Sequence, residues 1–150
     1  MSRLRSLLWY WLPVVAWMAA IMALSSQSSL PLRENPATGE VIRTTYTLAK
    51  LAHVVEYGGL ALLLMRALTQ SGGGLALTFR VAAVWAVIAA TAFGACDELR
   101  QSLVPHREPR ATDVLIDGAS ACAAVLLLGG LRSARKLVAP ERRAAQTVPD

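Results

Sequence analysis

The chain has 150 residues, of which 55% are hydrophobic and only 17% are charged, and its mean hydropathy is +0.44. A soluble domain of this length needs a more highly charged surface, so this composition excludes an ordinary soluble protein and favours a single-domain integral membrane protein. The net charge is +5, but the basic residues flank the apolar stretches and have no stacking aromatic residues between them. This distribution indicates membrane topology and no nucleic-acid partner.

The first apolar stretch, residues 7–24, carries no charge and is long enough to cross a bilayer. It is too long for the apolar region of a signal peptide, and its aromatic start suits an interfacial anchor, so we expect a retained first span. Pro13 should bend this helix without breaking it. Residues 25–47 are rich in Ser, Thr and Pro and predict an exposed loop.

The remaining apolar stretches predict three more spans, over residues 48–68, 81–96 and 112–131. The glycine-rich residues 71–74 predict a short turn, and residues 102–111 predict a second loop. The fold class that follows is all-α, a bundle of four transmembrane helices over residues 1–136. A basic, weakly structured cytoplasmic tail is expected over residues 137–150.

The distribution of lysine and arginine predicts the orientation of the bundle. One side of the predicted spans carries nine of these residues: Arg3, Arg5, Arg66, Arg80, Arg132, Arg135, Lys136, Arg142 and Arg143. The other side carries six: Arg33, Arg43, Lys50, Arg100, Arg107 and Arg110. The richer side is expected to be cytoplasmic, which places both termini inside and predicts a multi-pass membrane protein.

Two cysteines, Cys96 and Cys122, lie in apolar segments without metal-ligand spacing. Cys96 should lie near one membrane face and Cys122 deeper, so no disulfide is expected between them. We expect buried, unreactive thiols.

With this topology, the polar residues of all four spans fall in the outer half of the bundle. They are Ser25 and Ser26 in span one; Lys50, His53, Glu56 and Tyr57 in span two; Asp97, Glu98 and Gln101 in span three; and Asp113 and Asp117 in span four. The helical rise places an outer layer of Lys50, Gln101 and Asp113 above an inner layer of Glu56, Tyr57, Asp97 and Asp117. Spacings of three, four and seven residues place the partners on common faces, which predicts a shared polar pocket.

Each of these residues also has a structural interpretation. Lys50 has the alternative role of a side chain that extends to the interface, and Asp113 that of a residue that favours a helix start. The serines suit hydrogen bonds to carbonyls at a helix end, and Glu98, about 100° around the helix from Asp97, suits a position facing headgroups. Ionisable groups at membrane depth are costly and usually functional. For that reason we take His53, Glu56, Asp97 and Asp117 as candidate catalytic residues, against the alternative of a structural ion network.

Taken together, the polar motifs resemble those of the VanZ-like family of small bacterial membrane proteins. The matching elements are SSQS at residues 25–28, K-x-x-H-x-x-E-Y from Lys50 to Tyr57, D-E-x-x-Q from Asp97 to Gln101, P-x-R from Pro105 to Arg107, and D-x-x-x-D from Asp113 to Asp117. The resemblance implies a polytopic membrane protein with a role in the cell envelope or in susceptibility to glycopeptides such as teicoplanin. It does not imply a particular reaction.

The chain departs from the family pattern at two places. His106 stands where the family usually has Gly, and Asp117 stands where Asn is common, followed by Ser120 and Ala124 in place of glycines. The additional carboxylate of Asp117 would have to be protonated, paired with Lys50 or Arg107, or placed beside a cation.

Three functions fit the sequence. The first is an outward-facing site that binds or modifies an envelope molecule, such as a cell-wall precursor or a lipid headgroup. Its candidate ligand-binding residues are Lys50, Tyr57, Glu98, Gln101, Arg107 and Asp113, and a divalent cation held by His53, Glu56, Asp97 and Asp117 is a further hypothesis. The second is a non-catalytic binding protein, and the third is a scaffold in which the buried charges form an ion network. The oligomeric state and the presence of catalysis are left open.

Overall fold

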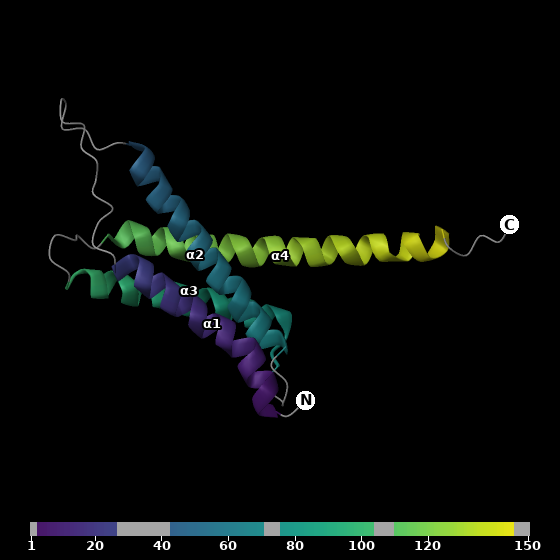
Figure 1. The fold of residues 1–150 in the computed structure, drawn as a ribbon. Helices are drawn as coiled ribbons and strands as arrows, with labels where there is room; N and C mark the ends of the chain where they lie inside the picture. Colours follow the sequence, from purple (N-terminus) through teal and green to yellow (C-terminus); the bar gives the residue numbers. More distant parts are fainter. Residues whose placement is uncertain (1–2, 27–42, 71–75, 104–109, 146–150) are drawn as a thin grey trace.

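The computed structural model describes residues 3–26, 43–70, 76–103 and 110–145. These ranges form four helices and no strand: α1 (Arg3–Ser26), α2 (Arg43–Gln70), α3 (Phe79–Gln101) and α4 (Ala111–Ala145) (Figure 1). Each helix contains a segment long and apolar enough to cross a membrane: Leu4–Ser26, Lys50–Gln70, Phe79–Gln101 and Ala111–Lys136. The predicted all-α fold with four membrane-spanning helices is confirmed.

Every helix is longer than the apolar stretch that predicts it. α2 begins at Arg43, inside the segment predicted as a loop, and α3 continues five residues past Cys96 to Gln101. α4 runs to Ala145, beyond residue 136 where the sequence predicts the membrane domain to end. Hydropathy marks only the part of a helix suited to lipid, whereas backbone hydrogen bonding continues through polar residues. The division into a domain and a tail stays a prediction.

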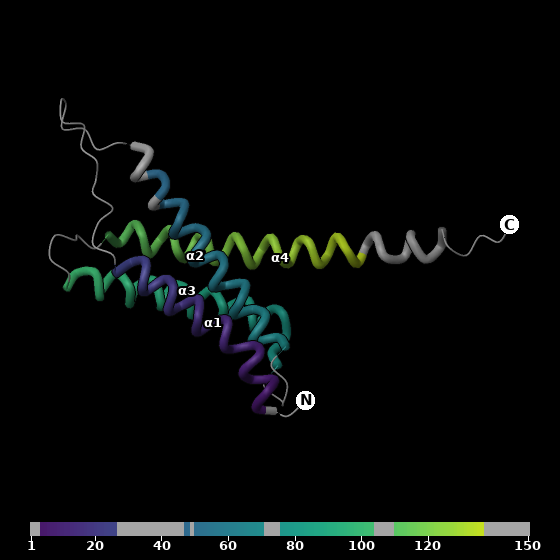
Figure 2. The backbone as a smooth tube through the Cα atoms, in the orientation of Figure 1, coloured from purple at the N-terminus to yellow at the C-terminus, as the bar shows by residue number. Residues whose placement is uncertain are grey.

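The helices alternate in direction, so the end of α1, the start of α2, the end of α3 and the start of α4 lie at one end of the bundle (Figures 1 and 2). We call this the polar end. At the opposite end, the Leu77 amide donates a hydrogen bond to the Leu68 carbonyl (2.8 Å). There the Arg66 guanidinium lies 4.9 Å from the centre of the Tyr10 ring. Which end faces the cytoplasm stays a prediction.

Small residues allow the helices to approach closely. The buried face of α3 carries a small residue at every fourth position: Ala82, Ala86, Ala90 and Gly94. Small residues at helix interfaces favour close packing in a membrane, where dispersion contacts replace the hydrophobic effect. Within the described chain, α2 packs against all three other helices, and α1 and α4 do not contact each other.

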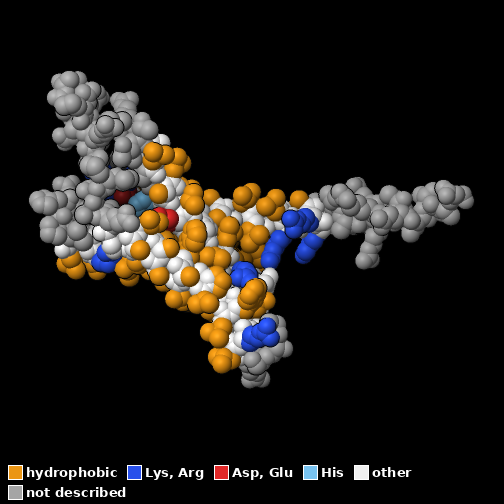
Figure 3. All heavy atoms as spheres, in the orientation of Figure 1, with side chains coloured by type: hydrophobic (Ala, Val, Ile, Leu, Met, Phe, Trp, Pro, Cys, Tyr) orange, Lys and Arg blue, Asp and Glu red, His pale blue; other side chains and the backbone are white. Residues whose placement is uncertain are grey.

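The outer surface of the bundle is apolar. Large hydrophobic side chains such as Trp9, Trp85, Leu115 and Leu126 are more than half exposed, and hydrophobic side chains cover the middle of the face shown in Figure 3. This surface is suited to lipid. Cys96 and Cys122 belong to it: both are free and exposed, so the expectation of buried thiols is wrong. Their apolar surroundings in the sequence reflect contact with lipid and not a place in the core.

Candidate functional site

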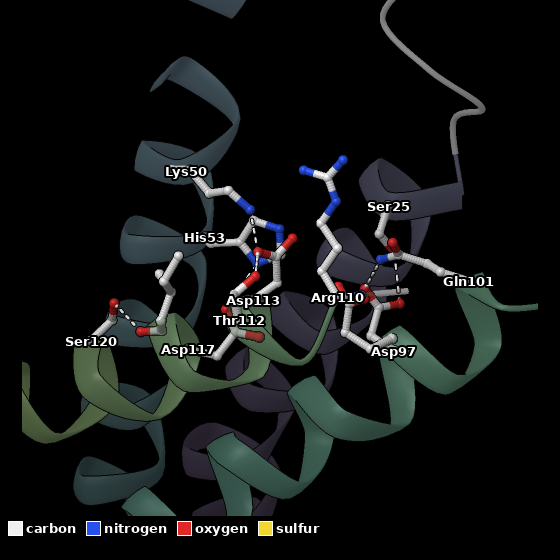
Figure 4. A network of polar contacts seen from close by, with 12 residues as sticks. Ser25, Lys50, His53, Asp97, Gln101, Arg110, Thr112, Asp113, Asp117 and Ser120 are labelled. Carbon is white, nitrogen blue, oxygen red and sulfur yellow. Dashed lines mark hydrogen bonds and ion pairs between the residues drawn. The ribbon is translucent and has the colours of Figure 1, made fainter. Parts of the chain in front are cut away.

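Charged and polar side chains from all four helices meet at the polar end (Figure 4). Of the described residues, five that are both polar and buried lie there: Asp97, Glu98, Gln101, Asp113 and Asp117. Together with Ser25, Ser26, Lys50, His53 and Arg100 they form what we call the polar cluster. Membrane-depth burial of so many carboxylates requires partners for each, because an unpaired buried charge is strongly unfavourable.

The α2–α4 part of the polar cluster contains two pairs. The Nδ1 atom of His53 lies 2.8 Å from Oδ1 of Asp117, and Lys50 forms an ion pair with Asp113 (Figure 4). Of the alternatives considered for Asp117, pairing with Lys50 is not the one that the structure contains, because Asp117 contacts His53 and Lys50 pairs with Asp113. Lys50 and His53 are three residues apart on α2, and Asp113 and Asp117 are four apart on α4. Successive polar residues on one face of α2 therefore each contact a successive carboxylate on the facing side of α4.

The α1–α3 part is centred on Asp97, whose side chain is 2% exposed. Its Oδ1 atom accepts hydrogen bonds from the Ser25 hydroxyl (2.8 Å) and from a terminal nitrogen of Arg100 (2.9 Å). Its Oδ2 atom accepts one from the Gln101 amide (2.8 Å). The predicted proximity of Asp97 and Gln101 is thus seen as a direct contact.

Arg100 enters the predictions from the sequence only through the count that predicts orientation, but the structure also places it in the polar cluster. Its guanidinium also donates to the hydroxyls of Ser25 (2.6 Å) and Ser26 (2.9 Å), so it joins α1 to α3. The spacing of three residues between Asp97 and Arg100 is the signal that would have identified this pair. Both serine hydroxyls also contact the Met22 carbonyl, as the structural interpretation expected, and Ser25 in addition donates to Asp97.

Glu98 lies between the two parts. Its side chain does not face headgroups, which corrects the expectation from its angular position, because Glu98 is only 6% exposed. It continues the buried stripe of α3 at the fourth position after Gly94. Its Oε2 atom accepts a hydrogen bond from the backbone amide of Arg110 (2.9 Å), just before α4 begins. This contact ties the end of α3 to the start of α4.

Asp117 is completely buried, and its position depends on a glycine. A Cβ atom at Gly94 would lie 2.5 Å from Oδ2 of Asp117 and 3.2 Å from its Cβ and Cγ atoms. Only a residue without a side chain therefore fits opposite Asp117 on α3. The Oδ2 atom has no hydrogen-bond partner among the described residues.

Tyr57 and Glu56 border the cluster on α2. The Tyr57 ring is 1% exposed and stacks on His53, with ring centres 6.0 Å apart, and its hydroxyl has no hydrogen-bond partner within the described part of the chain. Glu56 lines an apolar groove of about 420 Å³ between α1 and α2, with Trp17, Ile21, Leu24, Leu51 and Val55 among the other lining residues. The Trp17 indole donates to the Glu56 carbonyl (2.8 Å) and joins the two helices.

Three potential metal-ligating side chains come together. One ligand atom each from His53, Glu98 and Asp113 lies within 4.8 Å of the others, and these residues belong to α2, α3 and α4. The grouping differs from the set predicted from the sequence. Asp97 is bonded to α1 and α3 side chains, Asp117 is bonded to His53, and Glu56 lines the groove. Arg107, Pro105, His106, Gln27 and Ser28 lie outside the described residues.

The family comparison agrees with the motifs at this site. The family model for VanZ/LLP1 matches residues 6–132, which include all four predicted spans and the whole polar cluster. The chain belongs to the VanZ/LLP1 family. No curated protein and no solved structure matches this VanZ-like chain. The chemistry of its site must therefore be argued from its own residues.

Proposed function

We propose that this VanZ-like protein binds or modifies a molecule of the cell envelope in the polar cluster, which would face the outer side of the bacterial inner membrane. The observation that carries the proposal is the convergence of buried carboxylates from α3 and α4, partly buried Lys50 and His53 from α2, and two serines of α1 at one end of the bundle. Ionisable groups within membrane spans are costly and are generally retained for function.

The groove beside the cluster favours a ligand that is part lipid. It is apolar except for Glu56, and it lies between α1 and α2, next to the helix that carries Lys50 and His53. A molecule with a hydrocarbon chain in the groove and a polar headgroup in the cluster would match both surfaces. A lipid headgroup or a lipid-linked cell-wall precursor has this chemistry, and a change in its presentation would affect susceptibility to glycopeptides such as teicoplanin.

Catalysis would require a proton acceptor near the ligand. His53, held by Asp117, and Glu56, at the edge of the groove, are the residues suited to that role. Asp97 is engaged with three partners and is better suited to positioning. Lys50, Tyr57, Gln101 and Asp113 remain candidate ligand-binding residues.

The test is the envelope phenotype of a strain that carries His53→Ala, Asp97→Asn or Asp117→Asn at membrane levels matched to the unaltered protein. We expect teicoplanin susceptibility to change towards that of a strain without the protein. Ser133→Ala is the matched control, since Ser133 is exposed on α4, 16 residues past Asp117, and donates to the Gly129 carbonyl of its own helix. An unchanged phenotype at normal abundance would contradict the proposal.

A structural ion network is the second candidate, favoured by the Lys50–Asp113, His53–Asp117 and Arg100–Asp97 pairs. It predicts that the same variants lose abundance and not only phenotype.

An enzyme and a binding protein would then be distinguished by incubating purified protein with lipid-linked wall precursors and measuring turnover. A reporter fused after Asp150 should read as cytoplasmic, and an external reading would contradict the outward-facing site.

A further inference from the structure

We propose that His53, Glu98 and Asp113 bind a divalent metal ion, with Asp117 as the residue that positions His53. The inference deepens the proposed function and rests on it for the identity of the ligand, but the metal site itself is argued from geometry. One ligand atom from each residue lies within 4.8 Å of the others. Two atoms that each lie about 2.3 Å from one ion are at most about 4.6 Å apart, so a small inward movement of these side chains would let them contact a common ion.

Two of the three ligands are oriented by a second contact. His53 uses Nδ1 to contact the buried carboxylate of Asp117, which leaves Nε2 for a metal. Glu98 uses Oε2 to accept the Arg110 amide, which leaves Oε1. Metal-ligating histidines commonly donate their other ring N–H to a carboxylate, and such contacts fix the tautomer and the ring orientation. The polar cluster has this arrangement before any ion is added.

Asp117 is fixed from the opposite side as well. Gly94 of α3 leaves just enough room for its carboxylate, and its side chain is completely buried. The carboxylate is thus packed against α3 while its Oδ1 atom contacts His53. A completely buried carboxylate therefore contacts the His53 imidazole. An ion pair on the surface would not require such burial.

The charge balance also favours a cation. The polar cluster contains four carboxylates: Asp97, Glu98, Asp113 and Asp117. Its cationic side chains are Lys50 and Arg100. With a neutral His53, two negative charges are left without a cation, and a divalent ion would balance them. An acidic pocket of this kind would bind an anionic headgroup best through such an ion.

The ligand set indicates which ions to use. Two carboxylates suit Mn²⁺ and Mg²⁺, and an imidazole suits Zn²⁺ and other transition metals, so Mn²⁺ is a suitable probe. Three protein ligands leave coordination positions for water or for a phosphate oxygen of a lipid headgroup. Lys50 occupies one side of Asp113 and should compete with the metal for that carboxylate.

The experiment measures Mn²⁺ binding to the purified full-length protein in detergent by electron paramagnetic resonance, with Zn²⁺ as a competitor. We expect one Mn²⁺ per chain, with affinity at least about tenfold lower in Glu98→Gln, Asp113→Asn and Asp117→Asn. Glu56→Gln is the matched control, because Glu56 lies on the same helix as His53 and is not one of the proposed ligands. The Mn²⁺ affinity of this variant should stay close to that of the unaltered protein.

Lys50→Met provides a gain that misfolding cannot imitate. Removing the competing ammonium should raise Mn²⁺ affinity at least about threefold. Absence of Mn²⁺ and Zn²⁺ binding to the unaltered protein, or equal binding by Glu98→Gln, would overturn the inference. Because binding is measured without an envelope ligand, a bound ion with an unchanged teicoplanin phenotype would contradict only the proposed function. A changed phenotype without a bound ion would contradict only the metal site.

Discussion

Gly94→Ala tests the packing that holds the polar cluster together. The added Cβ would lie 2.5 Å from Oδ2 of Asp117, closer than any real contact of this type, and 3.2 Å from two further atoms of the same side chain. Asp117 is completely buried and bonded to His53, so it cannot move without breaking that contact or separating α3 from α4. We therefore expect Gly94→Ala to destabilise the bundle.

Gly130→Ala on α4 is the matched control. A Cβ there would meet nothing within 4 Å. Both substitutions gain the helix propensity of Ala over Gly, about 1 kcal/mol, so this contribution cancels when they are compared. Overpacking typically costs about 1–3 kcal/mol, which is the expected difference in the free energy of unfolding between the two variants. It corresponds to about a 5- to 150-fold change in the ratio of folded to unfolded protein.

The free energies of unfolding would be measured by denaturant titration in mixed micelles, with helix content as the signal. Adding Asp117→Ala to Gly94→Ala removes the atom of closest contact, so the two substitutions should be non-additive. Equal stability of the Gly94→Ala and Gly130→Ala variants would refute the close approach of α3 and α4. Additive effects would refute Asp117 as the residue in contact.

Two further predictions concern the contacts of α1. Arg100→Met should destabilise the protein by about 1–3 kcal/mol, because it leaves the buried Asp97 without its cation. Arg110→Met should have little effect, since only the backbone amide of Arg110 contacts Glu98. Equal melting temperatures of these two variants in detergent would contradict the prediction. Trp17→Phe should lower the free energy of unfolding by about 0.5–1.5 kcal/mol, because it removes the indole donor to the backbone carbonyl of Glu56. The same denaturant titration measures this change. An unchanged midpoint would show that this hydrogen bond does not stabilise the α1–α2 contact.

The sequence by itself determined that four helices span a membrane, because apolar segments of sufficient length are the direct requirement of a bilayer. It also predicted that the polar residues of these spans meet at one end, since alternating helices bring the end of residues 81–96 beside the start of residues 112–131. Helical spacing was enough to predict that Asp97 lies with Gln101, and Asp113 with Asp117, on common faces.

Only the tertiary structure decided which charges pair. Helix rotation and register set the partner of Asp117 as His53 and the partner of Lys50 as Asp113, and neither quantity can be read from periodicity within one helix. The same is true of Glu98, which is buried because the stripe of small residues on α3 faces α2 and α4. Contact with lipid and burial in the protein core both favour apolar neighbours in the sequence, which is why Cys96 and Cys122 were misplaced. The sequence could predict that these polar residues lie at one end of the bundle, but their relative positions depend on interhelical packing such as that of Gly94 against Asp117.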